Sequence, residues 1–410
     1  MPLNQDPKLG RIRSALPAIR SAVYLNAGTC GPLPEAAIQA MAAQAAEEAV
    51  QGRIRMELFA RKTLPEMAEL RAGFARLLHA TPEEIALTGN TTSGINTVIG
   101  GFPWRPGDEI AVTDLEYPGA LISPYLTARK LGLKLRTLRL LDAPAEDIPQ
   151  RVADGLSANC RLLLISHVCW SNGVRIPLCE TVQAAHQKNC QVLIDGAQSA
   201  GAIPVRLQDS GVDYYALPGQ KWLCGPEGMG ALYLRRDLQE ALLPTASGYF
   251  AMDFAAPHPW DCFGHVELHG DARRFEGSSV YHPAVAGMLA SLSWLEDQVG
   301  WEWAHARIEQ LQLHAREVLS RVAGLRLLTP RKAAGLLHFQ LQPETEATDL
   351  KKLTDLKDVE MKLSAQGIRI RSVPHTESLR VSTGFWNTEE EIDDLGHALQ
   401  EIGGTQRGPL

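Results

Sequence analysis

The chain has 410 residues, 45% of them hydrophobic, and carries a formal net charge of −7. A chain of this length can bury a large core and divide into roughly two or three domains. The net negative charge gives no positive electrostatic field to neutralise phosphates, so we expect no nucleic acid as a partner. The basic residues are scattered along the chain, so they predict no membrane-surface patch. No apolar window is long enough for a signal sequence or a spanning helix, so we expect no membrane either.

The seven cysteines are odd in number and form no Cys-x-x-Cys pair. This usage predicts neither a zinc site nor a disulfide framework, and we expect no metal. A reduced, cytoplasmic setting is the simplest interpretation.

Helical patterns and short apolar runs alternate through roughly the first half of the chain. Strands separated by helices of this length indicate βαβ units and a largely parallel sheet, and therefore an α/β fold. Helices are predicted over residues 34–50, 64–78, 118–131 and 178–188, with a further helix opening near residue 95. Strands are predicted over residues 84–88, 108–113, 162–165, 192–194 and 212–217.

The second half of the chain changes character. Residues 244–283 are rich in glycine, proline, histidine and aromatic residues, and a loop this long is usually functional or covers a partner. A long helical pattern then runs over residues 284–325, followed by strand candidates at 336–341 and 368–370 and a final helix over 389–402. We predict a large domain over residues 21–283 and a smaller α+β domain made of residues 1–20 and 284–410.

An acid and a lysine follow two of the predicted strands. Asp195 ends the first run, and Lys221 lies shortly after the second. If both strands are parallel, the two side chains emerge at the same carboxyl edge of the sheet, where open α/β folds bind ligands. An acid for a pyridinium nitrogen and a lysine for a Schiff base are what pyridoxal 5′-phosphate (PLP) requires of a protein. We therefore predict a PLP enzyme in which Lys221 also moves the Cα proton of the substrate.

Further side chains complete the predicted cofactor site. Thr91, Thr92 and Ser93 stand at a helix start, where hydroxyls and free backbone N–H groups suit a phosphate. Gln198 can donate to the phenolate oxygen of the cofactor. Tyr117 is the candidate for the ring that stacks on the cofactor face.

The order of these motifs resembles the class V aminotransferase, or cysteine desulfurase-like, family of fold-type I PLP enzymes. The stretches that carry the resemblance are Asn90-Thr91-Thr92-Ser93-Gly94, Glu116-Tyr117-Pro118-Gly119, Ser166-His167, Asp195-Gly196-Ala197-Gln198-Ser199, Lys221-Trp222 and Arg274-Phe275-Glu276. Within the family, the chain looks most similar to the cystine/cysteine C–S lyases, through Ser166-His167-Val168-Cys169-Trp170, Asp213-Tyr214-Tyr215-Ala216 and Gly225-Pro226.

The resemblance implies a large domain with a mostly parallel seven-stranded sheet and a smaller α+β C-terminal domain. It also implies a homodimer whose active sites lie at the subunit interface. Ser279 would then reach the phosphate of the neighbouring subunit, which would account for the length of the loop over residues 244–283.

The resemblance further implies an amino-acid substrate. Arg380 matches the family's carboxylate-binding arginine, whose planar fork fits a carboxylate with two parallel hydrogen bonds. Arg371 resembles a second arginine of C–S lyases and would hold a further carboxylate, such as the far end of cystine, or else forms a surface salt bridge. Gly28 and Thr29 would contact the substrate from the N-terminal loop.

Departures from the family pattern bear on the reaction. The segment from Arg371 to residue 378 has no cysteine, although desulfurases need a loop thiol there to attack the substrate sulfur. Trp170 stands where desulfurases carry a substrate-facing asparagine, and Tyr117 where the family often has histidine. Gln220 replaces the histidine before the lysine and is expected at the cofactor. These differences favour elimination over desulfuration.

Three hypotheses for function remain open. The first is β-elimination from cysteine- or cystine-type amino acids, in which Lys221 takes the Cα proton, a thiolate or persulfide leaves, and pyruvate and ammonia form; His375 or Tyr117 would assist. The second is an epimerase, similar to isopenicillin N epimerases, or an aminotransferase of the same class, and a cysteine desulfurase is less favoured. The third is a degenerate fold retained as an interaction protein.

Overall fold

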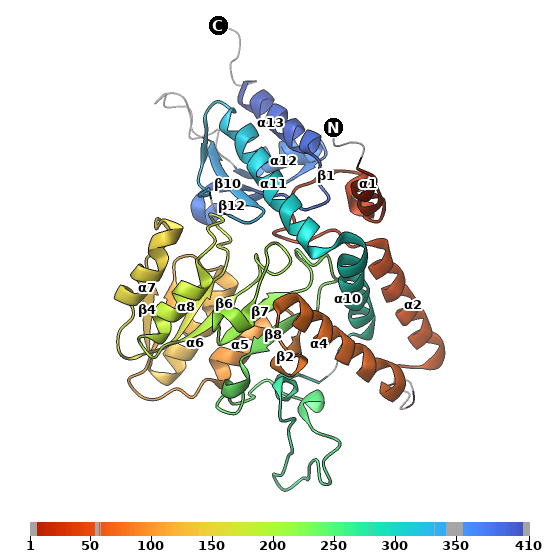
Figure 1. The fold of residues 1–410 in the computed structure, drawn as a ribbon, viewed down its shortest axis with the longest axis vertical. Helices are drawn as coiled ribbons and strands as arrows, with labels where there is room; N and C mark the ends of the chain where they lie inside the picture. The colour runs from red at the N-terminus through yellow and green to blue at the C-terminus, as the bar shows by residue number, and fades with distance from the viewer. Residues whose placement is uncertain are drawn as a thin grey trace.

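A computed structural model describes residues 6–53, 57, 59–278, 280–331, 333–341 and 356–404. Its larger part is built on a seven-stranded sheet of order β2-β8-β7-β6-β5-β3-β4 (Figure 1). In that order the strands span Ile85–Thr88, Gly230–Leu234, Tyr214–Pro218, Gln191–Asp195, Cys160–Ser166, Glu109–Thr113 and Lys134–Leu138. The five strands from β7 to β4 are parallel to their neighbours, and only β8 runs against both β7 and β2. The predicted α/β fold with a mostly parallel seven-stranded sheet is confirmed.

Helices cover both faces of this sheet, which explains why its central strands are continuous apolar runs. Leu163 and Ile165 of β5 pack into one core cluster with helices α4 (Leu64–Leu78), α7 (Ile148–Gly155) and α8 (Leu178–His186). Leu162 and Leu164, which alternate with them, pack into a second cluster with α5 (Thr91–Gly101) and α6 (Pro118–Leu131). Every residue of β5 except Arg161 is buried, so the strand ends are rigidly placed.

The smaller part is an antiparallel sheet of order β12-β13-β10-β9, covered by helices and drawn at the top of Figure 1. Its strands span Arg371–Val373, Ser378–Ser382, Leu336–Leu341 and Leu325–Leu327, and its helices are α11 (Trp301–Ser320), α12 (Leu356–Ala365) and α13 (Glu389–Gly404). It has its own core cluster. A short parallel pair joins β1 (Val23–Tyr24) to β11 (Ile368–Arg369), so the start of the chain is tied to this part.

Helix α10 (His282–Trp294) lies against α2 (Glu35–Gln51) and α4. Helix α10 spans the predicted domain boundary between residues 283 and 284. The division of the chain at that point stays a prediction. The single long helical pattern expected over residues 284–325 is two helices. Gly300, with φ of 75°, separates α10 and its last wide turn (Leu295–Val299) from α11.

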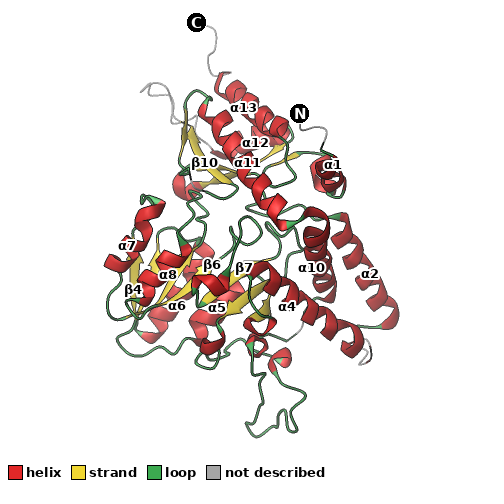
Figure 2. Cartoon of the chain, in the orientation of Figure 1, coloured by secondary structure: helices red, strands yellow, loops and turns green. Residues whose placement is uncertain are grey.

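The remaining helices are short. They are α1 (Pro7–Ser14), α9 (Leu207–Ser210), a wide turn at Phe59–Thr63, and single turns at Pro17–Arg20, Pro82–Glu84, Ala145–Asp147, Arg236–Leu238, Tyr249–Ala251, Ala272–Phe275 and Pro374–Thr376. Between β8 and α10 the chain is mostly loop, as predicted, and part of it extends away from the body (Figure 2). Ser279 lies outside the described residues. Within the described residues, none of the helices combines the length and apolar character needed to cross a membrane.

Candidate active site

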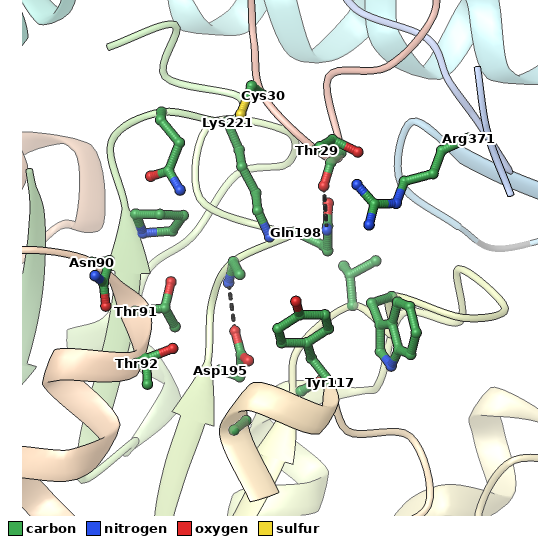
Figure 3. A pocket seen from close by; sticks show the side chains of 18 of the residues that line it. Thr29, Cys30, Asn90, Thr91, Thr92, Tyr117, Asp195, Gln198, Lys221 and Arg371 are labelled. Atoms are coloured by element: carbon green, nitrogen blue, oxygen red, sulfur yellow. Dashed lines mark hydrogen bonds between the residues drawn. The ribbon is translucent and has the colours of Figure 1, made fainter. Parts of the chain in front are cut away.

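The ends of two neighbouring strands place Asp195 and Lys221 in one cavity. Asp195 is the last residue of β6, and Lys221 follows the end of β7 by three residues. Both line a cavity of about 350 Å³ at the carboxyl edge of the sheet (Figure 3). The structure therefore brings together the acid and the lysine that the sequence analysis paired.

Asp195 is 5% exposed and accepts a hydrogen bond from the Ala197 N–H at 2.9 Å. Burial raises its pKa, and the positive charge of Lys221 and this hydrogen bond partly oppose that shift. A carboxylate in this position needs a cation to stay ionised. The protonated nitrogen of a pyridine ring is such a cation.

Lys221 has the complementary property. Burial lowers the pKa of its amine to about 8, against the opposing effect of Asp195. The charges of Arg380 and Arg371 lower it further. An amine with a depressed pKa is a better nucleophile and base near neutral pH, as a lysine that binds PLP must be.

The start of α5 forms one end of the cavity. Asn90 is its N-cap and accepts from the Ser93 N–H at 2.9 Å and from the Ser93 hydroxyl at 3.2 Å. Asn90, Thr91 and Thr92 line the cavity, whereas Ser93 does not and is engaged in the cap. The positive end of a helix with two adjacent threonine hydroxyls suits a phosphate. Of the three predicted phosphate residues, Thr91 and Thr92 are thus well placed and Ser93 is not.

Gln198 is fixed by two buried partners. Its Oε1 accepts from the indole N–H of Trp222 at 3.1 Å, and its Nε2 donates to the Gly28 carbonyl at 2.8 Å. Because an indole N–H can only donate, the orientation of the amide is set. The second hydrogen on Nε2 remains for a ligand, in keeping with the predicted contact to the cofactor oxygen.

Aromatic rings form a wall of the cavity. Tyr117 and Trp170 both line it and meet edge to face, with ring centroids 5.2 Å apart. The Trp170 indole N–H donates to the Glu116 carbonyl at 2.9 Å. His375 stacks on Trp170 at 6.1 Å and does not line the cavity. The structure therefore gives no direct contact for the role in catalysis that the sequence analysis assigned to His375.

Two arginines reach the cavity from the smaller part of the molecule. Arg380 is 3% exposed and donates from Nη2 to the Thr29 hydroxyl at 2.8 Å. Burial and, secondarily, the charge of Arg371 lower its pKa to about 10. Arg371 and Thr29 line the same cavity, as does Gly28. An anionic group in the cavity would neutralise this concentration of positive charge.

Some cavity residues were missed by sequence reasoning. Cys30 and Glu227 line it, and the Cys30 thiol lies 3.9 Å from the Glu227 carboxylate. Cys30 directly follows the predicted contacts Gly28 and Thr29, so its place in the chain was the available signal. Glu227 lies in the loop after Lys221, and no sequence pattern in that loop indicates an acid that faces the cavity.

Several polar atoms show that the cavity is built for a polar ligand. Arg380 Nε and Gln220 Oε1 are buried and have no partner among the described residues. With the acid–lysine pair and the helix start, these atoms supply the charged and polar contacts that PLP and an amino acid require. The residues present fit PLP.

Comparisons with known proteins agree with this chemistry. The family model described as aminotransferase class-V matches residues 23–395. The chain is 30% identical over 393 residues to isopenicillin N epimerase of Streptomyces clavuligerus, covering 93% of this chain and 95% of that protein. It is 28% identical over 414 residues to a probable cysteine desulfurase of Methanothermobacter thermautotrophicus, covering 96% and 98% of the two chains.

Solved structures extend the comparison. The cystine C–S lyase C-DES, in complex with its reaction product cysteine persulfide, is 28% identical with a TM-score of 0.86, covering 94% of this chain and 99% of that one. A C-DES mutant with glycine covalently linked to the PLP cofactor has a TM-score of 0.87 at 27% identity, covering 95% and 99%. The predicted resemblance and cofactor are confirmed. The chain therefore belongs to the class V aminotransferase family, whose fold-type I enzymes work with PLP on amino acids.

Proposed function

We propose that this enzyme is a β-eliminating C–S lyase that acts on cysteine- or cystine-type amino acids and gives pyruvate, ammonia and a sulfur product. The observation that carries the proposal is the pair Arg371 and Arg380, two guanidinium groups in one cavity with Lys221. Cystine has a carboxylate at each end, so the pair matches its charges. The similarity to C-DES supports the same assignment.

PLP, when bound, supplies an electron sink for the negative charge that develops at Cα. Lys221 Nζ takes the Cα proton, and its depressed pKa keeps a substantial fraction of the amine neutral near pH 8. Asp195, buried at the end of β6, would pair with the ring nitrogen and keep it protonated. Arg380 fixes the α-carboxylate, already oriented by its hydrogen bond to Thr29.

The remaining cavity residues control the leaving group. Arg371 would hold the far carboxylate of cystine, and Tyr117 and Trp170 form the aromatic wall of the same cavity. The Cα–H and Cβ–S bonds break, and the sulfur leaves with the electron pair of the Cβ–S bond. The eliminated product takes up water and gives pyruvate and ammonia. A thiolate or persulfide is a good leaving group, so no strong general acid is required.

The absence of a thiol from the segment that follows Arg371 supports lyase over desulfurase. That segment forms β12, the turn Pro374–Thr376 and the start of β13, and none of its residues is a cysteine. Epimerisation is the second candidate, because a relative of 30% identity is an isopenicillin N epimerase. Epimerisation would need a second proton donor facing Cα, and Tyr117 is the acid–base side chain that the aromatic wall offers.

A panel of sulfur amino acids tests the proposal. The purified holoenzyme is incubated with cysteine, cystine and their disulfide analogues, and pyruvate is followed with a coupled dehydrogenase. Pyruvate from cystine without an added sulfur acceptor is expected, and none should form with Lys221→Ala. Consumption of an α-keto acid without pyruvate release would instead identify an aminotransferase, and loss of optical activity without ammonia would identify an epimerase.

We also propose a homodimer. The loop between β8 and α10 exposes Phe254, Trp260 and Phe263, the last at 92%, and apolar surface of this kind usually contacts a partner. The expected contribution of Ser279 to a neighbouring active site stays a prediction, as does the cytoplasmic setting. Sedimentation of the holoenzyme should give twice the mass of the chain, and Phe263→Asp should weaken that association.

A further inference from the structure

A second buried acid, Glu116, lies behind the cavity wall. It is 3% exposed and sits in the turn between β3 and α6. Its Oε1 lies 2.7 Å from the Thr113 hydroxyl and 2.9 Å from the Ser166 N–H, and its Oε2 lies 2.7 Å from the Ser166 hydroxyl. The proposed function gives this acid no role.

Ser166 connects Glu116 to the cofactor site. It is the last residue of β5 and the register partner of Asp195 in the neighbouring parallel strand β6. Ser166 and Asp195 both line the cavity. The Ser166 hydroxyl therefore lies between a buried acid on one side and the cofactor site on the other.

Two neighbouring buried acids do not both ionise at low cost. Asp195 has the Ala197 N–H and the charge of Lys221 to stabilise its anion. Glu116 has neutral donors, and the nearby charge acting on it is that of Asp195 itself. Burial, followed by the charge of Asp195, raises the pKa of Glu116 to about 8. Cys169 is a nearby thiol on which the charge of Glu116 acts, and burial above all raises its pKa to about 11.

The hydrogen bonds show where the proton of a neutral Glu116 resides. The Ser166 N–H can only donate, so Oε1 must accept from it. The Thr113 hydroxyl oxygen already accepts from the Leu115 N–H at 3.1 Å, which leaves its own hydrogen free to point at Oε1. Oε1 is thus the carbonyl-type oxygen, and the acid proton sits on Oε2, facing the Ser166 hydroxyl oxygen.

We propose that Glu116 is a neutral acid that donates its proton to Ser166 Oγ and so makes the Ser166 hydroxyl a fixed hydrogen-bond donor into the cavity. Since Oγ accepts from Glu116, its own hydrogen is directed away from that residue. Because Ser166 lines the cavity beside Asp195, the residue that would pair with the ring nitrogen, this hydrogen would be available to an acceptor atom of the bound cofactor. Glu116 is a positioning residue in this arrangement, and Ser166 makes the contact.

The variant Glu116→Gln imitates the neutral acid. Its carbonyl oxygen accepts from the Ser166 N–H and Thr113, and its NH₂ group donates to Ser166 Oγ; the reverse orientation would set two N–H donors against each other. We expect Glu116→Gln to bind PLP within about twofold of the native protein at pH 7, and Ser166→Ala and Glu116→Ala to bind it about tenfold more weakly. Equal losses in Glu116→Gln and Glu116→Ala would overturn the proposal.

Infrared spectroscopy reads the proton directly and does not depend on how well Glu116→Ala folds. The native holoenzyme at pH 7 should show a carboxylic-acid carbonyl stretch that is missing from Glu116→Gln. Identical spectra in this region would show that Glu116 is ionised and the inference wrong. A rise in KM of Ser166→Ala with unchanged PLP affinity would move the acceptor from the cofactor to the substrate, contrary to the proposal. The PLP-binding and infrared readouts do not depend on which amino acid the enzyme cleaves.

Discussion

Arg371 and Arg380 are register partners on the adjacent strands β12 and β13, and both side chains reach the cavity that contains Lys221. The two positively charged guanidinium groups repel each other, and burial further disfavours the charged form of Arg380. A ligand with two carboxylates relieves both effects, whereas a ligand with one relieves them in part. Substrates with one and with two carboxylates should therefore respond differently when either arginine is removed.

We expect Arg380→Ala to weaken catalysis on every substrate and Arg371→Ala to weaken it mainly on cystine. Arg380→Ala should lower kcat/KM for every amino-acid substrate by about 30- to 150-fold, since it removes a charge-assisted contact to the common α-carboxylate. Arg371→Ala should lower kcat/KM about tenfold for cystine and leave cysteine within about threefold. Steady-state kinetics with both substrates measure this. Equal losses on both substrates in Arg371→Ala would contradict a role at the far carboxylate.

Capture of PLP by the apoprotein should depend on pH through Lys221. Only the neutral amine reacts with the cofactor aldehyde, and burial places the pKa of this amine at about 8. The rate of borohydride-trapped incorporation should rise about tenfold per pH unit below that value and level off above it. Because the charge of Asp195 raises the pKa of Lys221, Asp195→Asn should reach its plateau at a lower pH. A rate that keeps rising tenfold per pH unit from pH 8 to pH 10, with no plateau, would argue against a depressed lysine pKa.

Glu116 should make native stability fall as pH rises. Its pKa is raised from the ordinary 4.5 to about 8 on folding, so the folded protein binds more protons than the unfolded chain between these values. Stability from this group is complete below pH 4.5 and is lost as pH approaches 8. Glu116→Gln lacks this loss, so its advantage in urea unfolding should grow by about 3 kcal/mol between pH 4.5 and pH 7. A constant difference between the two proteins would refute a neutral Glu116.

Glu276 should contribute strongly to stability, although it lies far from the substrate. It is 2% exposed and accepts from Arg71 at 2.7 and 2.8 Å and from the Leu87 N–H at 2.9 Å. Glu276→Ala leaves the Arg71 charge buried without its partner and should cost about 3–5 kcal/mol of unfolding free energy. Glu69→Ala, which breaks the exposed pair with Arg76, is a matched control and should cost less than about 1 kcal/mol.

The sequence predicted the parts of the site that lie at the ends of regular elements. Asp195 and Lys221 were found because apolar runs mark the strands before them, and Thr91 and Thr92 because they open a helix. Ser93 stays a prediction as a phosphate contact, and it lies outside the cavity lining because its N–H and hydroxyl both donate to the capping side chain of Asn90.

Other features were missed. β4, Lys134–Leu138, is an edge strand that is largely exposed and polar, so it lacks an apolar run. β8, Gly230–Leu234, is a buried apolar run of only five residues and follows directly on a glycine-rich turn. His375, predicted to assist catalysis, lies against Trp170 and outside the cavity lining, so its role stays a prediction. Such placements depend on how loops from distant segments pack, which periodicity does not report.

The loop that holds Gly28 and Cys30 packs directly on the Lys221 turn: Gly31 donates to the Gln220 carbonyl at 2.8 Å, and a Cβ at Gly31 would lie 2.1 Å from the Lys221 carbonyl oxygen. The segment with Gly28, Thr29 and Cys30 and the segment with Arg371 and Arg380 thus meet at one cavity, although they lie far apart in the sequence. On the ribosome, the lysine and its acid emerge well before Arg371 and Arg380 are translated. A nascent chain can therefore bring together the acid and the lysine first, but it gains the ability to select a substrate only after the segment with Arg371 and Arg380 has also been made.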